Sequence, residues 1–223
     1  MHKYQAMIFD LDDTLLDRDK ALAGFLRLII EKCYQDIDII NFEEMLMRFR
    51  EIDRHGHNSN KVEVLAELYK SHSPAYMIPE EEVVDYWNNT FPSCFTLATK
   101  TIETVTRIKE TAQVAIITNG VTKTQRSKIE NSGLAEYFDT ILISQEVGIS
   151  KPDRRIFQMA LAKLKVKAEE TLFVGDNLEG DIAGCQSAGI KGIWINPWDL
   201  SNNTDIKPYQ EIKDLSELLV YFA

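Results

Sequence analysis

The sequence predicts an α/β fold, in which a parallel β-sheet with helices on both faces carries an inserted helical domain. Five short apolar segments alternate with amphipathic segments, as in successive βαβ units. Each apolar segment ends abruptly in polar residues, which is typical of buried parallel strands. The stretch 17–95 contains helical patterns only, so it is predicted to be a separate insert.

The core elements follow one another along the chain in alternating order. We predict strands at residues 4–9, 114–118, 140–144, 171–174 and 192–195. We predict helices at residues 100–111, 123–132, 154–164 and 178–188. The site of an open parallel sheet lies beyond the carboxyl ends of its strands, so the polar residues there are the candidates for function.

The inserted stretch shows helical spacing of apolar residues at 21–33, 42–52, 61–69 and 80–89. Proline residues punctuate it, and it is too long to be a simple connection between strands. We therefore predict two domains, a core formed by 1–16 and 96–223 and a helical domain formed by 17–95.

Composition narrows the classes of function. The 223 residues carry a net charge of -10, and 44% of them are hydrophobic, as in an ordinary globular protein. The chain has no Lys/Arg-dense run, so we expect no nucleic-acid partner. An acidic chain that handles an anionic substrate must concentrate positive charge locally, with a metal ion or a few basic side chains.

The cysteines and the apolar segments indicate the compartment. Cys33, Cys94 and Cys185 are widely spaced and form no CxxC pair, which argues against zinc and against a disulfide framework. No signal peptide is evident, and no apolar run approaches the roughly 20 residues of a membrane span. We expect a cytoplasmic protein without a membrane partner.

Asp10 and Asp12 follow the first predicted strand. Side chains alternate in extended backbone, so the two carboxylates start on the same side and repel unless a cation or a proton lies between them. Mg²⁺ takes such oxygen ligands, and one carboxylate could act as nucleophile and the other as general acid/base. The alternative is a solvated turn or a helix N-cap.

Thr118 and Asn119 end the second predicted strand, before Gly120. A hydroxyl and an amide can hydrogen-bond phosphate oxygens there, and glycine lets backbone N–H groups approach closely. The alternative is an ordinary strand-to-helix turn capped by Thr118.

Lys151 follows the third predicted strand, within the segment 148–153. Its ammonium is a compact charge that suits a phosphate or a crowded set of carboxylates. The alternative is a surface lysine, as most lysines are.

Asp176 and Asp181 follow the fourth predicted strand. Asp176 could be a metal ligand, and Asp181, one turn into the next helix, could orient water, Lys151 or a metal ligand. The alternative is helix capping by Asp176 or Asn177, with Asp181 a favourable first-turn acid.

The four motifs DLDDT, ITNG, SKPD and GDNLEGD, in this order, resemble those of the haloacid dehalogenase-like hydrolase superfamily. The resemblance spans residues 4–197 and implies a Rossmann-like core. The inserted helical domain at 17–95 resembles the helical cap of the first class in that superfamily.

The resemblance implies a role for each motif. Asp10 would be the nucleophile that forms an aspartyl-phosphate, and Asp12 would protonate the leaving oxygen and then activate water. Thr118 and Asn119 would bind the phosphoryl group, and Lys151 would hold it against the nucleophile.

A Mg²⁺ site is also implied. Asp176 would complete it together with the Asp10 carboxylate and the Asp12 backbone carbonyl, and Asp181 would support these ligands or bind more directly. Dehalogenases of the superfamily lack an acid two positions after the nucleophile, so Asp12 favours phosphate chemistry.

We therefore expect a Mg²⁺-dependent phosphomonoesterase. A sugar phosphomutase and a non-catalytic binding module on the same fold remain alternatives. The segments around the second and third motifs resemble nucleotidase-like phosphatases and those acting on N-acylneuraminate 9-phosphate. The expected partner is thus a small phosphorylated metabolite, a nucleotide or a sugar phosphate. Polar candidates for contact with it in the cap are Asp17, Arg18, Arg48, Arg54, His55 and His57.

Overall fold

The computed structural model describes residues 4–35, 41–54, 58 and 60–222. The chain divides into two compact units, one formed by Met1–Leu16 with Leu97–Ala223 and the other by Asp17–Thr96. We call them the core and the cap and describe each by itself. In the described part of the chain, no helix is both long and apolar enough to cross a membrane.

The core contains one fully parallel sheet, which confirms the predicted Rossmann-like α/β class. The strand order is β3-β2-β1-β4-β5-β6. The strands are β1 (Ala6–Phe9), β2 (Gln113–Thr118), β3 (Thr140–Ile143), β4 (Thr171–Gly175), β5 (Lys191–Ile195) and β6 (Gln210–Ile212). Phe9 lies opposite Ile116 and Val174 in the neighbouring strands, so three central strands end close to one level.

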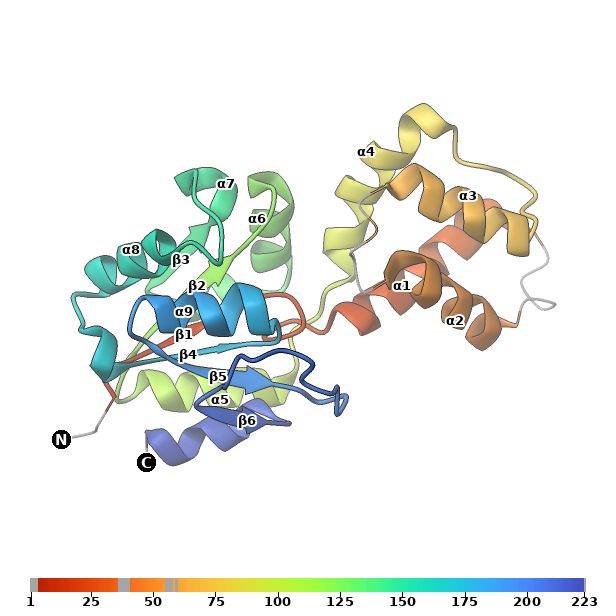
Figure 1. Ribbon diagram of the computed structural model, residues 1–223. Helices are drawn as coiled ribbons and strands as arrows, with labels where there is room; N and C mark the ends of the chain where they lie inside the picture. Colours follow the sequence, from red (N-terminus) through yellow and green to blue (C-terminus); the bar gives the residue numbers. More distant parts are fainter. Residues whose placement is uncertain (1–3, 36–40, 55–57, 59, 223) are drawn as a thin grey trace. The chain divides into compact units, whose positions relative to one another are not determined.

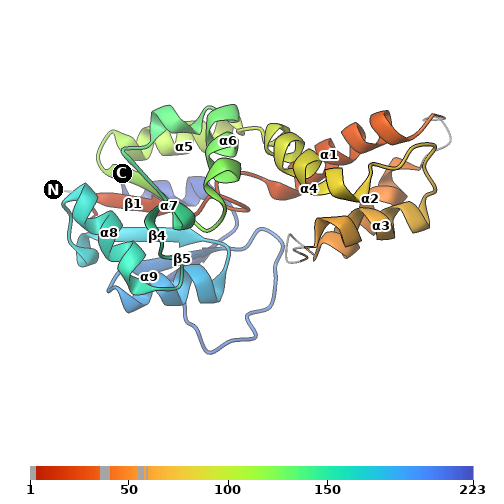
Figure 2. The same ribbon diagram turned by 90° about the horizontal axis from the view of Figure 1, so that it is seen from above.

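Helices cover both faces of this sheet, as Figures 1 and 2 show. One face carries α5 (Thr99–Lys109) and α6 (Thr122–Asn131), and the other carries α8 (Arg154–Leu164) and α9 (Gly184–Ser187). Alternate residues of β1 and β2, together with Phe173 of β4, pack against α8 in one hydrophobic cluster. In it, the rings of Phe157 and Phe173 meet edge to face at 5.3 Å between centroids.

The connections place a topological switch point at the centre of the sheet. The chain passes from β1 to β2 and β3 on one side, and from β4 to β5 and β6 on the other. Ligands of open α/β sheets bind beyond the carboxyl ends of the strands at such a point. The loops after β1 and β4 are therefore the place to look for a site.

Several elements of the core differ from the predictions, among them a 3₁₀ helix at Leu215–Tyr221 that was not predicted. The edge strand β6 was not predicted, because three residues are too few to show a period. Ser144 begins a short helix α7 (Ser144–Val147) instead of ending β3. The helix predicted at 178–188 begins as a π-helical turn, Leu178–Ala183, in which the Asn177 carbonyl accepts from Ile182 N–H at 3.3 Å.

The cap contains the four predicted helices, α1 (Arg18–Cys33), α2 (Phe42–Asp53), α3 (Lys61–Ser71) and α4 (Glu80–Thr90). Its centre is aromatic: Phe25 contacts Phe49, Trp87 and Phe91, at centroid distances of 4.7 to 6.4 Å. Trp87 is thus a packing residue.

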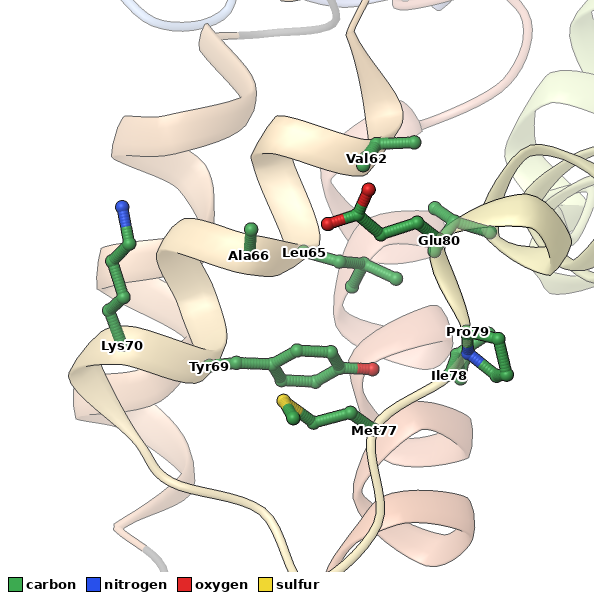
Figure 3. Close-up of a pocket in the computed structure, with 10 residues that line it drawn as sticks. Val62, Leu65, Ala66, Tyr69, Lys70, Met77, Ile78, Pro79 and Glu80 are labelled. Atoms are coloured by element: carbon green, nitrogen blue, oxygen red, sulfur yellow. The ribbon is translucent and has the colours of Figure 1, made fainter.

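The cap also holds a pocket of about 490 Å³ with mainly apolar walls. Figure 3 shows Leu65 and Tyr69 of α3 pointing toward Ile78 and Pro79, whereas the Lys70 side chain points away. None of the carboxylates or lysines of the four motifs lines this pocket; all of them belong to the core.

Candidate active site

Asp10 lies at the switch point, directly after β1. Its backbone N–H donates to the carbonyl of Val174 at 2.9 Å, which continues the sheet pairing by one residue. Its side chain is buried, and one carboxylate oxygen forms a close ion pair with the Lys151 ammonium. The first and third motifs therefore meet, although they are 141 positions apart in the sequence.

Lys151 is buried, so the alternative of a surface lysine is wrong. Its Nζ lies 2.6 Å from Oδ1 of Asp181, in addition to its contact with Asp10. The Asn119 side chain holds the backbone of Lys151 from both sides. Asn119 Oδ1 accepts from Lys151 N–H and Asn119 Nδ2 donates to the Lys151 carbonyl, both at 2.9 Å. The second motif thus fixes the third.

The acids of the fourth motif converge on the same place. Asp10, Asp176 and Asp181 each offer one carboxylate oxygen, and these oxygens lie within 4.8 Å of one another. Asp181 Oδ2 also accepts from the Asn177 N–H at 3.1 Å. Trp194 Nε1 donates to the Asp176 carbonyl at 2.7 Å, so a buried aromatic side chain fixes the backbone of this acid.

Gly175 makes this arrangement possible. A Cβ atom at this position would lie 2.3 Å from Oδ2 of Asp181. Atoms cannot approach that closely, so any side chain at residue 175 would displace the Asp181 carboxylate. The glycine before Asp176 is thus required by the packing of the acid five positions further on.

The crowding of carboxylates changes their protonation. Burial raises the pKa of Asp10 to about 7, and nearby Asp181 adds to the rise while Lys151 opposes it. Burial, followed by the negative charges of Asp10 and Asp181, raises the pKa of Asp176 to about 9. Burial disfavours the Lys151 ammonium, but Asp10 and Asp181 outweigh it and raise the pKa of Lys151.

This donor set fits a hard divalent cation. Three clustered carboxylates provide the oxygen ligands that Mg²⁺ prefers, and burial together with their mutual repulsion raises the pKa of Asp10 and Asp176, which a bound cation would counteract. Asp10 and Asp176 belong to the predicted metal ligands, and Asp181, predicted to support them, lies within the same cluster.

The Asp12 carboxylate lies against other partners. Both of its oxygens are 2.7 Å from Lys128 Nζ, and Oδ2 accepts from Gln125 Nε2 at 3.0 Å. The backbone turns sharply here, since Asp13 adopts a positive φ of 57°. The Asp12 carboxylate is not among the clustered oxygens of Asp10, Asp176 and Asp181, although its negative charge adds to the rise that burial causes in the pKa of Asp10.

Comparison with known proteins identifies the family. Residues 7–195 match the model of the haloacid dehalogenase-like hydrolase family. The chain belongs to this family. The resemblance inferred from the four motifs is thereby confirmed, and the chain is a hydrolase by family.

Three relatives of this haloacid dehalogenase-like hydrolase cover most of its length. HAD-hydrolase YfnB of Bacillus subtilis is 29% identical over 98% of this chain and 95% of its own. Pyrimidine 5'-nucleotidase YjjG of Escherichia coli is 26% identical over 97% and 96%. Human N-acylneuraminate-9-phosphatase is 28% identical over 88% and 84%. A crystal structure of YfnB bound to magnesium matches with a TM-score of 0.79 at 27% identity, covering 98% of both chains.

Two residues of the site in this family member were not predicted from the sequence. Gln125 and Lys128 are only 2% and 6% exposed, although both are polar. Their spacing of three places them on one face of α6, directly after the second motif. That spacing was the available signal. Ile129 is the one apolar residue of the segment 122–131 and is also buried, so it marks the face on which Gln125 and Lys128 lie.

Three of the polar candidates of the cap, Asp17, Arg18 and Arg48, have partners within the cap itself. Arg18 binds Asp53 at 2.5 Å, Arg48 binds Glu51 at 3.0 Å, and the Asp17 side chain accepts from Lys20 N–H at the start of α1. Arg54 is the C-cap residue of α2. His55 and His57 lie outside the described residues. Contact of these residues with substrate stays a prediction.

Proposed function

We propose that this protein is a Mg²⁺-dependent phosphomonoesterase that acts through an aspartyl-phosphate on Asp10. The observation that carries the proposal is the position of the Asp10 carboxylate, which is ion-paired with Lys151 and clustered with Asp176 and Asp181. The family relatives include a nucleotidase and an N-acylneuraminate-9-phosphatase, which supports a small phosphorylated metabolite as the substrate.

The reaction proceeds in two displacements at phosphorus. A carboxylate oxygen of Asp10 attacks, the bond to the leaving oxygen breaks, and Asp12 gives that oxygen a proton. Asp12, now a carboxylate, takes a proton from a water that attacks the phosphorus, and the bond to Asp10 breaks. Inorganic phosphate leaves, and both acids return to their initial states.

Three groups would bind the phosphoryl oxygens. The Lys151 ammonium, already on Asp10, supplies positive charge beside the nucleophile. The Thr118 hydroxyl at the end of β2 supplies a hydrogen bond. The Asn119 side chain is engaged with the Lys151 backbone, so Asn119 would contribute through its backbone N–H.

The metal would be held by the carboxylates of Asp10 and Asp176 and by the Asp12 backbone carbonyl, with Asp181 close by. When bound, Mg²⁺ neutralises charge on the carboxylates and on the phosphoryl oxygens. Within the cluster, the Lys151 ammonium pairs with both Asp10 and Asp181, and Asp176 adds a third carboxylate. The ionised carboxylates therefore outnumber this one cation, which suits a divalent metal ion.

The test is a phosphate-release assay over nucleoside monophosphates, sugar phosphates, flavin mononucleotide and p-nitrophenyl phosphate. We expect release with Mg²⁺, none with a chelator, and none from the Asp10→Asn variant. If the parent releases no more phosphate than the Asp10→Asn variant from any of these substrates, the proposal is refuted. Isomerised sugar phosphate in place of free phosphate would identify a mutase instead.

The free thiols of Cys33, Cys94 and Cys185 support a reducing compartment such as the cytoplasm.

A further inference from the structure

We propose that Gln125 and Lys128 of α6 are positioning residues: Lys128 holds the Asp12 carboxylate in place for proton transfer, and Gln125 couples Asp12 to the Thr118 hydroxyl. This inference rests on the proposed function, because it assigns Asp12 and Thr118 their roles in phosphoryl transfer. All four residues belong to the core, so the geometry lies within one compact unit.

Lys128 fixes Asp12 from the protein side. Its Nζ is 2.7 Å from both carboxylate oxygens, and its side chain is only 7% exposed. The Asp12 side chain keeps 28% exposure, so the held carboxylate is still reachable by a ligand. A carboxyl group that transfers a proton in two successive steps must stay in one position relative to the substrate. The buried Lys128 ammonium contacts both Asp12 oxygens and so restricts rotation of the Asp12 carboxylate.

Gln125 uses both hydrogens of one amide nitrogen. Nε2 donates to Asp12 Oδ2 at 3.0 Å and to Thr118 Oγ1 at 2.6 Å. An ionised carboxylate only accepts, so the nitrogen and not the oxygen of the amide must face Asp12. Thr118 then accepts from Gln125, and its own hydroxyl hydrogen is directed at the Asn119 carbonyl at 3.4 Å, a long bond that a phosphoryl oxygen would replace.

The loop after β2 makes room for this glutamine. A Cβ at Gly120 would lie 3.0 Å from Cγ of Gln125, and Gly120 has a φ of 147°, which side chains rarely adopt. The backbone N–H of Gln125 also donates to the Val121 carbonyl, which begins α6 at this point. The end of β2 and the first turns of α6 thus present Gln125 and Lys128 to the acid of the first motif.

The two residues should give different kinetic signatures. Lys128→Met removes the charge that holds Asp12, so we expect kcat to fall about 10- to 100-fold with little change in KM. Gln125→Leu removes the donor to Thr118, so we expect a rise in KM as well. Lys128→Arg, which can still donate to both oxygens, should keep most of the activity. The matched control is Arg126→Met on the same helix, where only an exposed ion pair with Glu146 is lost.

A double-mutant cycle with Asp12→Asn gives the decisive measurement. Once the acid is absent, Lys128→Met should cost nothing further in kcat/KM, because both substitutions remove one function. In the parent, the loss from Lys128→Met should be larger with an alkyl phosphate than with p-nitrophenyl phosphate, since the alkoxide needs the proton more. Equal losses in both backgrounds and with both substrates would overturn the inference and show a structural role.

Failure of this inference can be told from failure of the proposed function. If the parent releases phosphate and Asp10→Asn does not, the proposed function stands and the cycle alone decides the roles of Lys128 and Gln125. If the parent releases none, both fail together. If circular dichroism shows that Lys128→Met does not fold, the same cycle is run with Gln125→Leu. Additive losses of kcat/KM from Gln125→Leu and Asp12→Asn would then contradict a coupling between Gln125 and Asp12.

Discussion

At the scale of single residues, Lys151 explains why the distant motifs form one site. Its ammonium contacts Asp10 and Asp181, and its backbone is held by Asn119. Each of these partners comes from a different loop at the carboxyl edge of the sheet. A buried charge without such partners would cost several kcal/mol, so the surrounding loops and the lysine stabilise one another.

The first prediction concerns the proposed acid/base. Asp12→Asn should lower kcat by about 10²- to 10⁴-fold, the usual effect of removing a positioned acid/base. Substrate binding should persist, because Asp10, Lys151 and the metal ligands are unchanged. Steady-state kinetics together with inhibition by inorganic phosphate would measure both quantities. Equal kcat in variant and parent would show that Asp12 does not transfer the proton.

The second prediction concerns Gly175. The Cβ of Gly175→Ala would collide with Asp181, so this carboxylate must leave the cluster. We expect Mg²⁺ affinity, measured by calorimetry, to fall about 10- to 100-fold, as when other groups that support metal ligands are changed. Gly24→Ala is the control, since its Cβ would find its nearest neighbour at 3.5 Å, an ordinary contact. Unchanged affinity in Gly175→Ala would remove Asp181 from the proposed metal site.

At the scale of elements, the helices of the cap are joined by a buried charge. Asp53 at the end of α2 is fully buried and binds Arg18 of α1, with Nη1 at 2.5 Å and Nη2 at 3.2 Å. Lys61 of α3 lies 3.4 Å from the same carboxylate. One acid thus ties three helices of the cap together, next to the aromatic cluster around Phe25 and Trp87.

The third prediction tests that joint. Asp53→Asn leaves two cations without their carboxylate, and breaking a buried pair in this way typically costs about 3–5 kcal/mol. We expect the cap to become sensitive to limited proteolysis at lower urea concentration than in the parent. Glu51→Gln, which breaks only an exposed pair with Arg48, should change stability by less than about 1 kcal/mol. Equal sensitivity of the two variants would show that the Asp53 cluster does not hold the cap together.

At the scale of the whole molecule, the acidic cluster links stability to pH and metal. The pKa of Asp10 is raised from 3.8 to about 7 and that of Asp176 from 3.8 to about 9. From pH 3.8 up to the raised pKa values, the metal-free folded protein binds more protons than the unfolded chain. Its free energy of unfolding therefore decreases as the pH rises through this range. Mg²⁺ needs the ionised carboxylates, so its stabilising effect should increase over the same range.

The fourth prediction follows from this linkage. The difference in Tm between protein with Mg²⁺ and protein with a chelator should be small near pH 5.5 and larger near pH 9. Differential scanning fluorimetry at several pH values would measure it, with Asp176→Asn as the variant in which the difference shrinks. The same Mg²⁺ effect at both ends of the range would contradict the assignment of these carboxylates as ligands.

Much of this architecture was predictable from the sequence. The five apolar segments became β1 to β5, because a parallel strand buried on both faces leaves an uninterrupted apolar run. The four helices of the cap were predicted from apolar spacing alone. The edge strand β6 and the π-helical turn after Asn177 were not, since neither has a period that distinguishes it.

For the candidate site, the predictable part was the set of polar residues at strand ends. The partners of each side chain were not predictable. Asp10 and Asp12 were expected to start on one side, and the sequence could not show that the Asp12 carboxylate binds Lys128 and Gln125 of α6. Gln125 and Lys128 escaped prediction because one apolar residue in α6, Ile129, is too weak a pattern to show which polar side chains are buried beside it. Long-range contacts of this kind depend on the sheet topology, which local patterns do not encode.

The hydrogen bond from Trp194 to the Asp176 carbonyl gives the molecule a built-in optical probe. Indole emission responds to nearby charge, and this indole is bonded to the residue whose charge a cation would neutralise. The chain has only two other tryptophans, Trp87 in the cap and Trp198 on the surface. Replacing both by phenylalanine would leave a single fluorophore beside the acidic cluster, whose intensity should change on titration with Mg²⁺ and stay constant in Asp176→Asn.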